Sequence, residues 1–258
     1  MKIDFHVHQP ARREDGTYPF SAAEYVAYMN ELSIDISVIF TIDGFWQNAK
    51  ACNDYLAEWC SPFPNRLVPF CTVDPRRRGA AEEVYRCVTE LGMRGVKLHN
   101  WLQGFSPLEA FMAPVCEIAS ELGIPILFHD GTPPYASSLQ IAELAVRHPK
   151  LKVLLGHAGL HDLWLEAIAA GKRHRNVYLC MCSTPPFAME QIVAEVPLEQ
   201  IVFGTDGGLF HKPKQPYVDY RFQEFNLLDL PEATKTQILG PNALRLLGID
   251  GKEASQRL

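Results

Sequence analysis

The chain has 258 residues, of which 47% are apolar and 21% are charged, and its formal net charge is -6 with histidine neutral. This composition is typical of a globular protein. The acidic balance argues against nucleic acid as a partner, because phosphate binding requires a basic surface. The basic run 76–78 is short and is followed by Glu82 and Glu83, so we interpret it as a solvated helix start.

Other features of the composition concern the membrane and the compartment. No apolar run is long enough to span a membrane, and no signal peptide is expected, so we predict no membrane partner. The seven cysteines are odd in number and irregularly spaced, which favours free thiols and a cytoplasmic location. Cys180 and Cys182 share one strand face, and we interpret them as small buried hydrophobic residues.

Short β-rich apolar runs alternate with longer helical patterns along the chain. The predicted strand and helix pairs are 3–8 and 21–32, 34–40 and 46–60, 67–73 and 80–91, 95–99 and 108–122, 124–129 and 137–148, 151–157 and 162–170, and 177–182 and 188–196; the last strand, 201–205, precedes helices at 220–228, 231–239 and 241–247. Ser21, Ser137 and Asp162 are expected to cap the helices that follow them.

Eight strand-then-helix units imply right-handed βαβ connections and a parallel sheet. In a chain of about 250 residues they favour an α/β fold of the (β/α)₈ TIM-barrel type over an open sheet. No linker, low-complexity tract or short repeat divides the sequence. We therefore predict a single domain over residues 1–258.

Polar side chains stand at the carboxyl ends of the predicted strands. They are His6, His8, Lys97, His99, His129, His157 and Asp206. A closed parallel barrel brings strand ends together on the face where active sites are built. His6 and His8 alternate with Phe5 and Val7, so both imidazoles point into the barrel mouth if the apolar pair packs against the helices.

This joint pattern predicts a divalent metal ion at the barrel mouth rather than a polar cap without metal. Imidazoles with a carboxylate suit zinc, our first choice, and would also accept manganese, iron or cobalt. The remaining histidines are interpreted as structural or surface residues, including His211 in the loop after the last strand.

Six segments carry a resemblance to a known family. They are IDFHVH (3–8), RGVKLH (94–99), LFHDGT (127–132), LLGHAG (154–159), IVFGTDGG (201–208) and PNALRLLG (241–248). The chain resembles the amidohydrolase superfamily, and within it the amidohydrolase-related branch of aminocarboxymuconate-semialdehyde decarboxylase-like proteins.

The resemblance implies a role for each strand-end residue. His6, His8, His129 and Asp206 resemble the metal ligands, and Asp206 and His157 the catalytic proton carriers. Lys97 stands where two-metal relatives carry a carbamylated lysine. Lys97, His157 and His99 could therefore hold a second metal or the substrate, and the sequence leaves the number of metal ions open.

Two enzymatic hypotheses and one non-enzymatic hypothesis use this site. Metal-activated water would hydrolyse a small cyclic amide, ester or lactone, possibly one bearing a carboxylate. Alternatively, the metal would bind a small aromatic or unsaturated acid for non-oxidative decarboxylation. The third hypothesis is a metal-binding barrel without catalysis. The compact loop after the first strand favours the hydrolase, because decarboxylases of this branch generally carry an insertion there.

The substrate itself is not identified by the sequence. Phe45, Trp101 and Tyr135 follow strands and predict an aromatic-lined pocket for a small molecule. The oligomeric state is left open.

Overall fold

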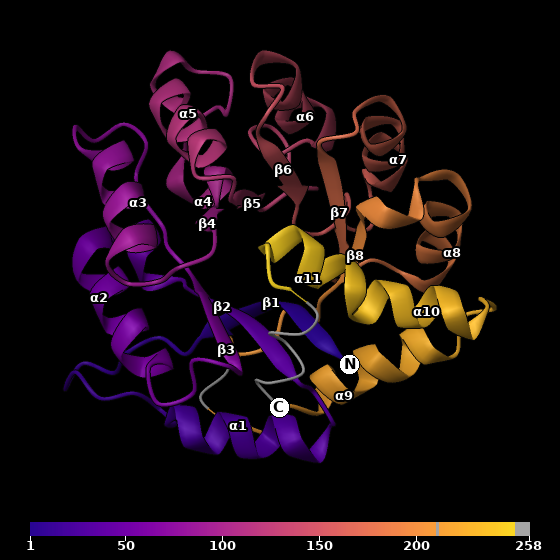
Figure 1. The fold of residues 1–258 in the computed structure, drawn as a ribbon, viewed down its shortest axis with the longest axis horizontal. Helices are drawn as coiled ribbons and strands as arrows, with labels where there is room; N and C mark the ends of the chain where they lie inside the picture. Colours follow the sequence, from indigo (N-terminus) through magenta and orange to yellow (C-terminus); the bar gives the residue numbers. More distant parts are fainter. Residues whose placement is uncertain (210–211, 251–258) are drawn as a thin grey trace.

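The computed structural model describes residues 1–209 and 212–250, and it contains eight strands that alternate with helices. The strands are β1 (Ile3–Gln9), β2 (Ile36–Thr41), β3 (Leu67–Phe70), β4 (Val96–Leu98), β5 (Pro125–Phe128), β6 (Lys152–Leu155), β7 (Val177–Met181) and β8 (Ile201–Phe203). The helices lie around the strands in Figure 1. The predicted α/β barrel of the TIM type is confirmed.

Each strand is followed by one or more helices. The α-helices are α1 (Ala22–Glu31), α2 (Ala49–Cys60), α3 (Ala80–Thr89), α4 (Asn100–Gln103), α5 (Ala113–Glu121), α6 (Ser138–Arg147), α7 (Trp164–Arg173), α8 (Pro186–Glu195), α9 (Pro216–Asn226), α10 (Glu232–Leu239) and α11 (Pro241–Leu247). Single 3₁₀ turns are η1 (Asp43–Phe45), η2 (Ala110–Met112) and η3 (Leu198–Gln200). No helix of the described residues is both long and apolar enough to cross a membrane.

All strand pairs are parallel and in sequence order, in two groups, β1–β3 and β4–β8. Two isolated bridges join these groups. Cys71 pairs with Val96, and Val7 pairs with Gly207. At the second junction the His8 N–H donates to the Gly207 carbonyl at 2.7 Å. The sheet is therefore closed, and the strand ends form one ring.

Strand β1 contains a bulge that changes which side chains face inward. Asp4 pairs with Ser37, but the next pair is Val7 with Ile39, so β1 has one extra residue there. Phe5 consequently joins the hydrophobic cluster inside the barrel, whereas Val7 packs with the outer layer. The expectation that Phe5 and Val7 share the outer face is wrong, because the bulge interrupts the alternation.

Helix α11 closes the amino-terminal end of the barrel. Its Leu244 and Leu247 belong to the interior cluster with Ile3 and Ile36, which stand at strand starts. In Figure 1, α11 lies inside the ring of outer helices. The polar strand-end residues stand at the opposite, carboxyl-terminal end of the barrel, which α11 does not cover.

Local capping matches the sequence at two of three positions. The Ser21 side chain accepts from the Glu24 N–H in a capping box, and Ser137 accepts from the Gln140 N–H. Asp162 makes no cap, because α7 begins later, after Leu163. His211 lies outside the described residues, and the single domain over 1–258 stays a prediction.

Candidate metal centre

The carboxyl ends of β1, β6 and β8 bring four predicted residues, His6, His8, His157 and Asp206, into direct proximity. Asp206 Oδ1 lies 3.0 Å from His8 Nε2 and 3.4 Å from His6 Nε2. The rings of His6 and His157 are 4.6 Å apart between centroids. His6, His8 and His157 are all buried. Residues that are 198 or more positions apart in the sequence thus meet because the barrel closes between β8 and β1.

The hydrogen bonds of His6 fix the tautomer of its ring. His6 Nδ1 lies 2.9 Å from the Gly156 carbonyl, which only accepts, so Nδ1 carries the proton. In the neutral ring Nε2 is then an acceptor that faces the Asp206 carboxylate at 3.4 Å. Two acceptors that face each other at this distance suit a cation held between them.

His157 fits a cation site in the same way as His6. His157 Nδ1 lies 3.3 Å from the Cys182 carbonyl, so Nδ1 donates and Nε2 is left as an acceptor. A metal-bound histidine commonly donates its second ring nitrogen to a carbonyl in this manner. His8 differs, because its Nε2 lies 3.0 Å from Asp206 Oδ1 and, among the described residues, its Nδ1 is buried without a hydrogen-bond partner. The donor set therefore fits a divalent ion.

The protonation states also suit metal ligands. Burial lowers the pKa of His6 well below its usual value, and lowers that of His157 to about 4, so both rings are neutral at pH 7. Burial alone would raise the pKa of Asp206, but the hydrogen bond from His8 is the largest effect in the other direction, and the pKa lies well below its usual range. The site thus presents neutral imidazoles and an ionised carboxylate, as metal binding requires.

The backbone is strained at three of these strand ends. Ala158, Ser183 and Asp206 adopt φ values of 47°, 57° and 65°, in the left-handed region that side chains rarely enter. Gly208, at φ 90°, has no alternative, since a Cβ there would lie 1.8 Å from the His8 carbonyl oxygen. Such strain clusters at functional sites, where the surrounding structure holds it.

Cys182 is a member of the site that the sequence interpretation missed. The ligand atoms of His6, His157, Cys182 and Asp206 all lie within 4.8 Å of one another. Cys182 is fully buried and follows β7 on the inner side of the barrel, together with Cys180. The Cys-x-Cys alternation is its signal in the sequence, but a small buried hydrophobic residue gives the same pattern.

His129 and His99 stand next to this cluster and contact each other. Their rings stack with centroids 3.8 Å apart, and the His129 ring is 4.5 Å from that of His157. His129 Nε2 lies 2.9 Å from Thr132 Oγ1, and His99 Nδ1 accepts from the Leu102 N–H at 3.3 Å. His129 as a metal ligand, and His99 as a second-metal or substrate residue, stay predictions.

Lys97 is entirely buried inside the barrel. Its Nζ lies 3.5 Å from His6 Nε2 and 4.9 Å from the centre of the Phe40 ring. Burial lowers the pKa of Lys97 to about 8. The ammonium approaches the same nitrogen lone pair that a metal ion would use, so an anion between Lys97 and the ion would relieve their repulsion.

Two further buried carboxylates hold the site in place. Asp130 accepts from the N–H groups of His157 and Gly159, each at 2.7 Å, and from Ser138 Oγ at 2.8 Å. Asp4 accepts from Thr205 Oγ1 at 2.6 Å and so ties β1 to the end of β8. Both stand in the motifs IDFHVH and LFHDGT, yet their neighbours in space are not visible in the sequence.

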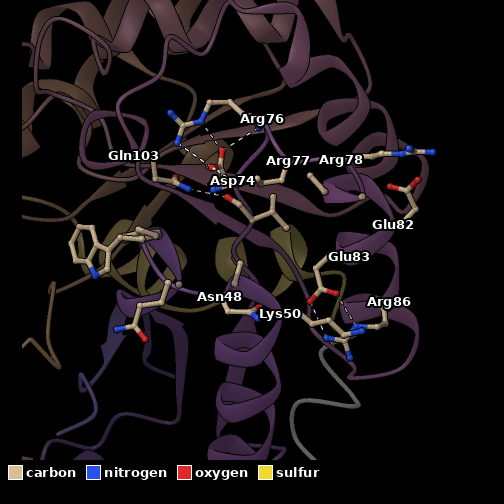
Figure 2. Close-up of a pocket in the computed structure, with 18 of the residues that line it drawn as sticks. Asn48, Lys50, Asp74, Arg76, Arg77, Arg78, Glu82, Glu83, Arg86 and Gln103 are labelled. Carbon is tan, nitrogen blue, oxygen red and sulfur yellow. Dashed lines mark hydrogen bonds and ion pairs between the residues drawn. The ribbon is translucent and has the colours of Figure 1, made fainter. Parts of the chain in front are cut away.

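The predicted aromatic pocket residues lie at different depths. Trp101 and Tyr135 are exposed, whereas Phe45 is buried and its ring is 5.5 Å from that of His99. Phe45 also lines a cavity of about 860 Å³ between the loops after β2 and β3. In Figure 2 this cavity is bordered by the basic run 76–78, where Arg76 pairs with Asp74 at 2.8 Å. None of the four clustered residues lines it, so it adjoins the site without containing it.

Three buried histidines and a partly exposed aspartate at the carboxyl end of a (β/α)₈ barrel are the arrangement expected of a metal-binding barrel enzyme. The profile of the amidohydrolase family matches residues 3–249, and the chain therefore belongs to this family, which is a family of enzymes.

Two relatives extend this assignment. The chain is 24% identical over 256 residues to gamma-resorcylate decarboxylase of Rhizobium sp., covering 79% of this chain and 76% of the relative. It is 22% identical over 271 residues to 2-amino-3-carboxymuconate-6-semialdehyde decarboxylase of Dictyostelium discoideum, covering 86% and 75%.

Solved structures share the fold. A 2,6-dihydroxybenzoate decarboxylase complexed with 2,6-dihydroxybenzoate aligns with a TM-score of 0.77, at 18% identity, over 97% of this chain and 99% of that chain. A dihydroxybenzoic acid decarboxylase of Polaromonas sp. with bound manganese aligns with a TM-score of 0.73, at 19% identity, over 96% of each chain. Manganese in that protein gives no specific support to zinc here.

These relatives correct the functional prediction. A hydrolase was expected from the compact loop after the first strand, but both relatives, matched over about three quarters of their length, are decarboxylases. The hydrolase prediction is therefore contradicted, and the carboxy-lyase alternative is the better supported. The length of one loop does not decide which reaction is catalysed at a site that both reactions share.

Proposed function

We propose that this protein is a metal-dependent, non-oxidative decarboxylase of a small aromatic or unsaturated acid. The observation that carries the proposal is the pair of mutually facing acceptors on His6 and Asp206, which suit a cation held between them, in a chain whose relatives are decarboxylases. The ion would be divalent and would be held by His6, His8, His129 and Asp206. When bound, it would supply Lewis-acid attraction for the oxygens of an acidic substrate.

The protein's own residues would orient the acid and move one proton. Lys97 would pair with a substrate carboxylate as a point charge, which also separates the ammonium from the ion. His157 would take up a proton from solvent at its free Nε2 and, together with Asp206, deliver that proton to the carbon that bears the carboxylate. The C–C bond then breaks, carbon dioxide leaves, and the electron pair returns to the ring or double bond. One proton replaces one carbon dioxide, so no oxidant is needed.

The enclosed walls of the barrel mouth support this chemistry. Phe40 packs on His6 and His8 with ring centroids 4.9 and 4.8 Å away, and it also lies beneath Lys97 Nζ. Apolar walls around the charged groups strengthen their interactions, because water screens them less. Apolar surroundings disfavour a charged group, so they would favour a reaction in which the negative charge of the acid is lost as carbon dioxide departs.

The test is a panel of hydroxybenzoic and unsaturated dicarboxylic acids offered to protein reconstituted separately with zinc, manganese and cobalt. We expect carbon dioxide release in equal amount to the decarboxylated product, and loss of release on chelation. Asp206→Asn should abolish turnover, whereas Asp162→Asn, an exposed carboxylate after β6, serves as the matched control. Tight metal binding without turnover of any acid would contradict the proposal and favour a non-catalytic metal-binding barrel.

A further inference from the structure

The end of strand β7 places a thiol where this metal centre has its ligands. The chain turns sharply there, because the Cys182 N–H donates to the Cys180 carbonyl at 2.8 Å and Ser183 follows with φ 57°. Cys180 and Cys182 both join the interior cluster. Only Cys182 belongs to the group of ligand atoms that lie within 4.8 Å of one another.

The spacing of these ligand atoms suits one shared ion. Zinc binds sulfur at about 2.3 Å and histidine nitrogen at about 2.0–2.1 Å, so ligand atoms of a tetrahedral site lie roughly 3–4 Å apart. The observed upper limit of 4.8 Å requires only small side-chain shifts. The His6 and His157 rings already present their free nitrogens as acceptors, because each Nδ1 faces a carbonyl.

Cys182 is tied to the site through its backbone as well. Its carbonyl faces His157 Nδ1 at 3.3 Å, and the following Thr184 donates from Oγ1 to the His157 carbonyl at 3.0 Å. The position of the thiol is thus coupled to that of the histidine beside it. Within the described part of the chain, no hydrogen bond is made to the Cys182 sulfur, so it is not committed to another partner.

We propose that the Cys182 sulfur is a direct ligand of the metal ion, together with His6 and Asp206. Binding replaces the thiol proton with the metal ion, and the proton is released to solvent. A thiolate is a soft ligand that favours zinc, cobalt or iron, whereas oxygen-rich sites suit manganese. The inference rests on the metal dependence of the proposed function, and it predicts a preference for zinc over the manganese found in several solved structures of similar fold.

The test uses the full chain, stripped of metal with a chelator and loaded with one equivalent of cobalt(II). Thiolate ligation gives a near-ultraviolet sulfur-to-cobalt charge-transfer band, and low coordination number gives intense visible bands. We expect both in the wild type. Cys182→Ser should lose the charge-transfer band and bind zinc roughly tenfold or more weakly, since even outer-shell partners contribute 10–100-fold.

Cys180→Ser is the matched control, because Cys180 is equally buried, stands in β7 two residues before Cys182, and lies outside the ligand group. It should keep the band and the preference for zinc over manganese. X-ray absorption of the zinc-loaded wild type needs no variant and should contain a sulfur shell at about 2.3 Å.

The outcomes separate this inference from the proposed function. Cobalt bound by the wild type without a charge-transfer band, or zinc surrounded by nitrogen and oxygen alone, would overturn the thiolate ligand and leave the proposed function standing. A wild type that binds no zinc, cobalt or manganese would overturn both. A charge-transfer band that survives Cys182→Ser but disappears in Cys180→Ser would show that Cys180 is the sulfur ligand, and it would also refute the inference.

Discussion

Replacing Asp130 with asparagine should weaken the fold and the site together. The carboxylate receives three hydrogen bonds, with Oδ1 accepting from the His157 N–H and Oδ2 from the Gly159 N–H and Ser138 Oγ. An asparagine of the same shape keeps one oxygen and turns an NH₂ group toward at least one backbone N–H. A charge-assisted bond is then lost, and a buried donor is left unpaired.

The size of the effect follows from these contacts. Losing a bond to a charged acceptor costs about 1.5–3 kcal/mol, and an unpaired buried donor adds about 1–3 kcal/mol. Allowing for partial relaxation, we expect Asp130→Asn to reduce the free energy of unfolding by about 3 kcal/mol. For a chain of this size each kcal/mol lowers Tm by about 2–4 °C, so Tm should fall by roughly 6–12 °C.

Circular dichroism melts measure the effect on stability, and decarboxylation kinetics measure the effect on the site. Without this hydrogen bond the backbone N–H of His157 is no longer held in place, so the His157 side chain is positioned less well. We therefore expect kcat to fall while the protein still folds. Ser138→Ala removes one of the three bonds and should lower Tm by about 2–4 °C. Asp162→Asn, at an exposed carboxylate, should leave Tm unchanged. A Tm for Asp130→Asn within about 2 °C of the wild type would refute the importance of this three-bond anchor.

Three further predictions concern the site and the surface. His8→Ala should release the metal, while His157→Ala should keep most of it and lose activity, as measured by elemental analysis and carbon dioxide release; equal loss of metal would make His157 a ligand. Lys97→Met should keep about one metal per chain and raise KM for the acid, and carboxylated Lys97 between two ions in a crystal would disprove this. Burial alone would raise the pKa of Glu83, but hydrogen bonds, chiefly from Arg86, hold this pKa below its usual value. The ionised Glu83 therefore stabilises the fold at neutral pH, and this contribution is lost as the pH falls through the lowered pKa. Glu83→Gln should therefore lower Tm at pH 7, by an amount corresponding to about 1 kcal/mol, and the gap should narrow in acid; a gap that widens would contradict the assignment.

The barrel could be predicted because its signals are local. Each strand is a short apolar run next to a longer amphipathic helix, and both periods are visible in the sequence. The segment after β4 could not be predicted in the same way. A helix was expected over 108–122, but α5 begins at Ala113, and α4 exists because His99 caps it and Gln103 bonds to the Val73 carbonyl. Such contacts depend on the tertiary structure.

The candidate site shows the same limit. The strand-end residues His6, His8, His157 and Asp206 could be placed on one face because a closed barrel gathers strand ends. The inward direction of Phe5 depends on a bulge in β1, which strict alternation does not anticipate. A cysteine at the end of β7 gives the same sequence pattern whether it packs against apolar neighbours or faces a metal ion.

The reaction is the feature that the site residues decide least. A metal ion, an ionised aspartate and a neutral histidine can activate water, or they can hold an acid and protonate it. What separates the two is the charge that the rest of the pocket offers to the substrate. Lys97 is buried 3.5 Å from His6 Nε2, where it opposes a divalent ion unless an anion lies between them. A carboxylate that enters this position relieves the repulsion and leaves again as neutral carbon dioxide, which restores it. In the proposed decarboxylation the same ammonium would therefore favour both the binding of an acid and the release of its product, and this connects the composition of the pocket with the proposed reaction.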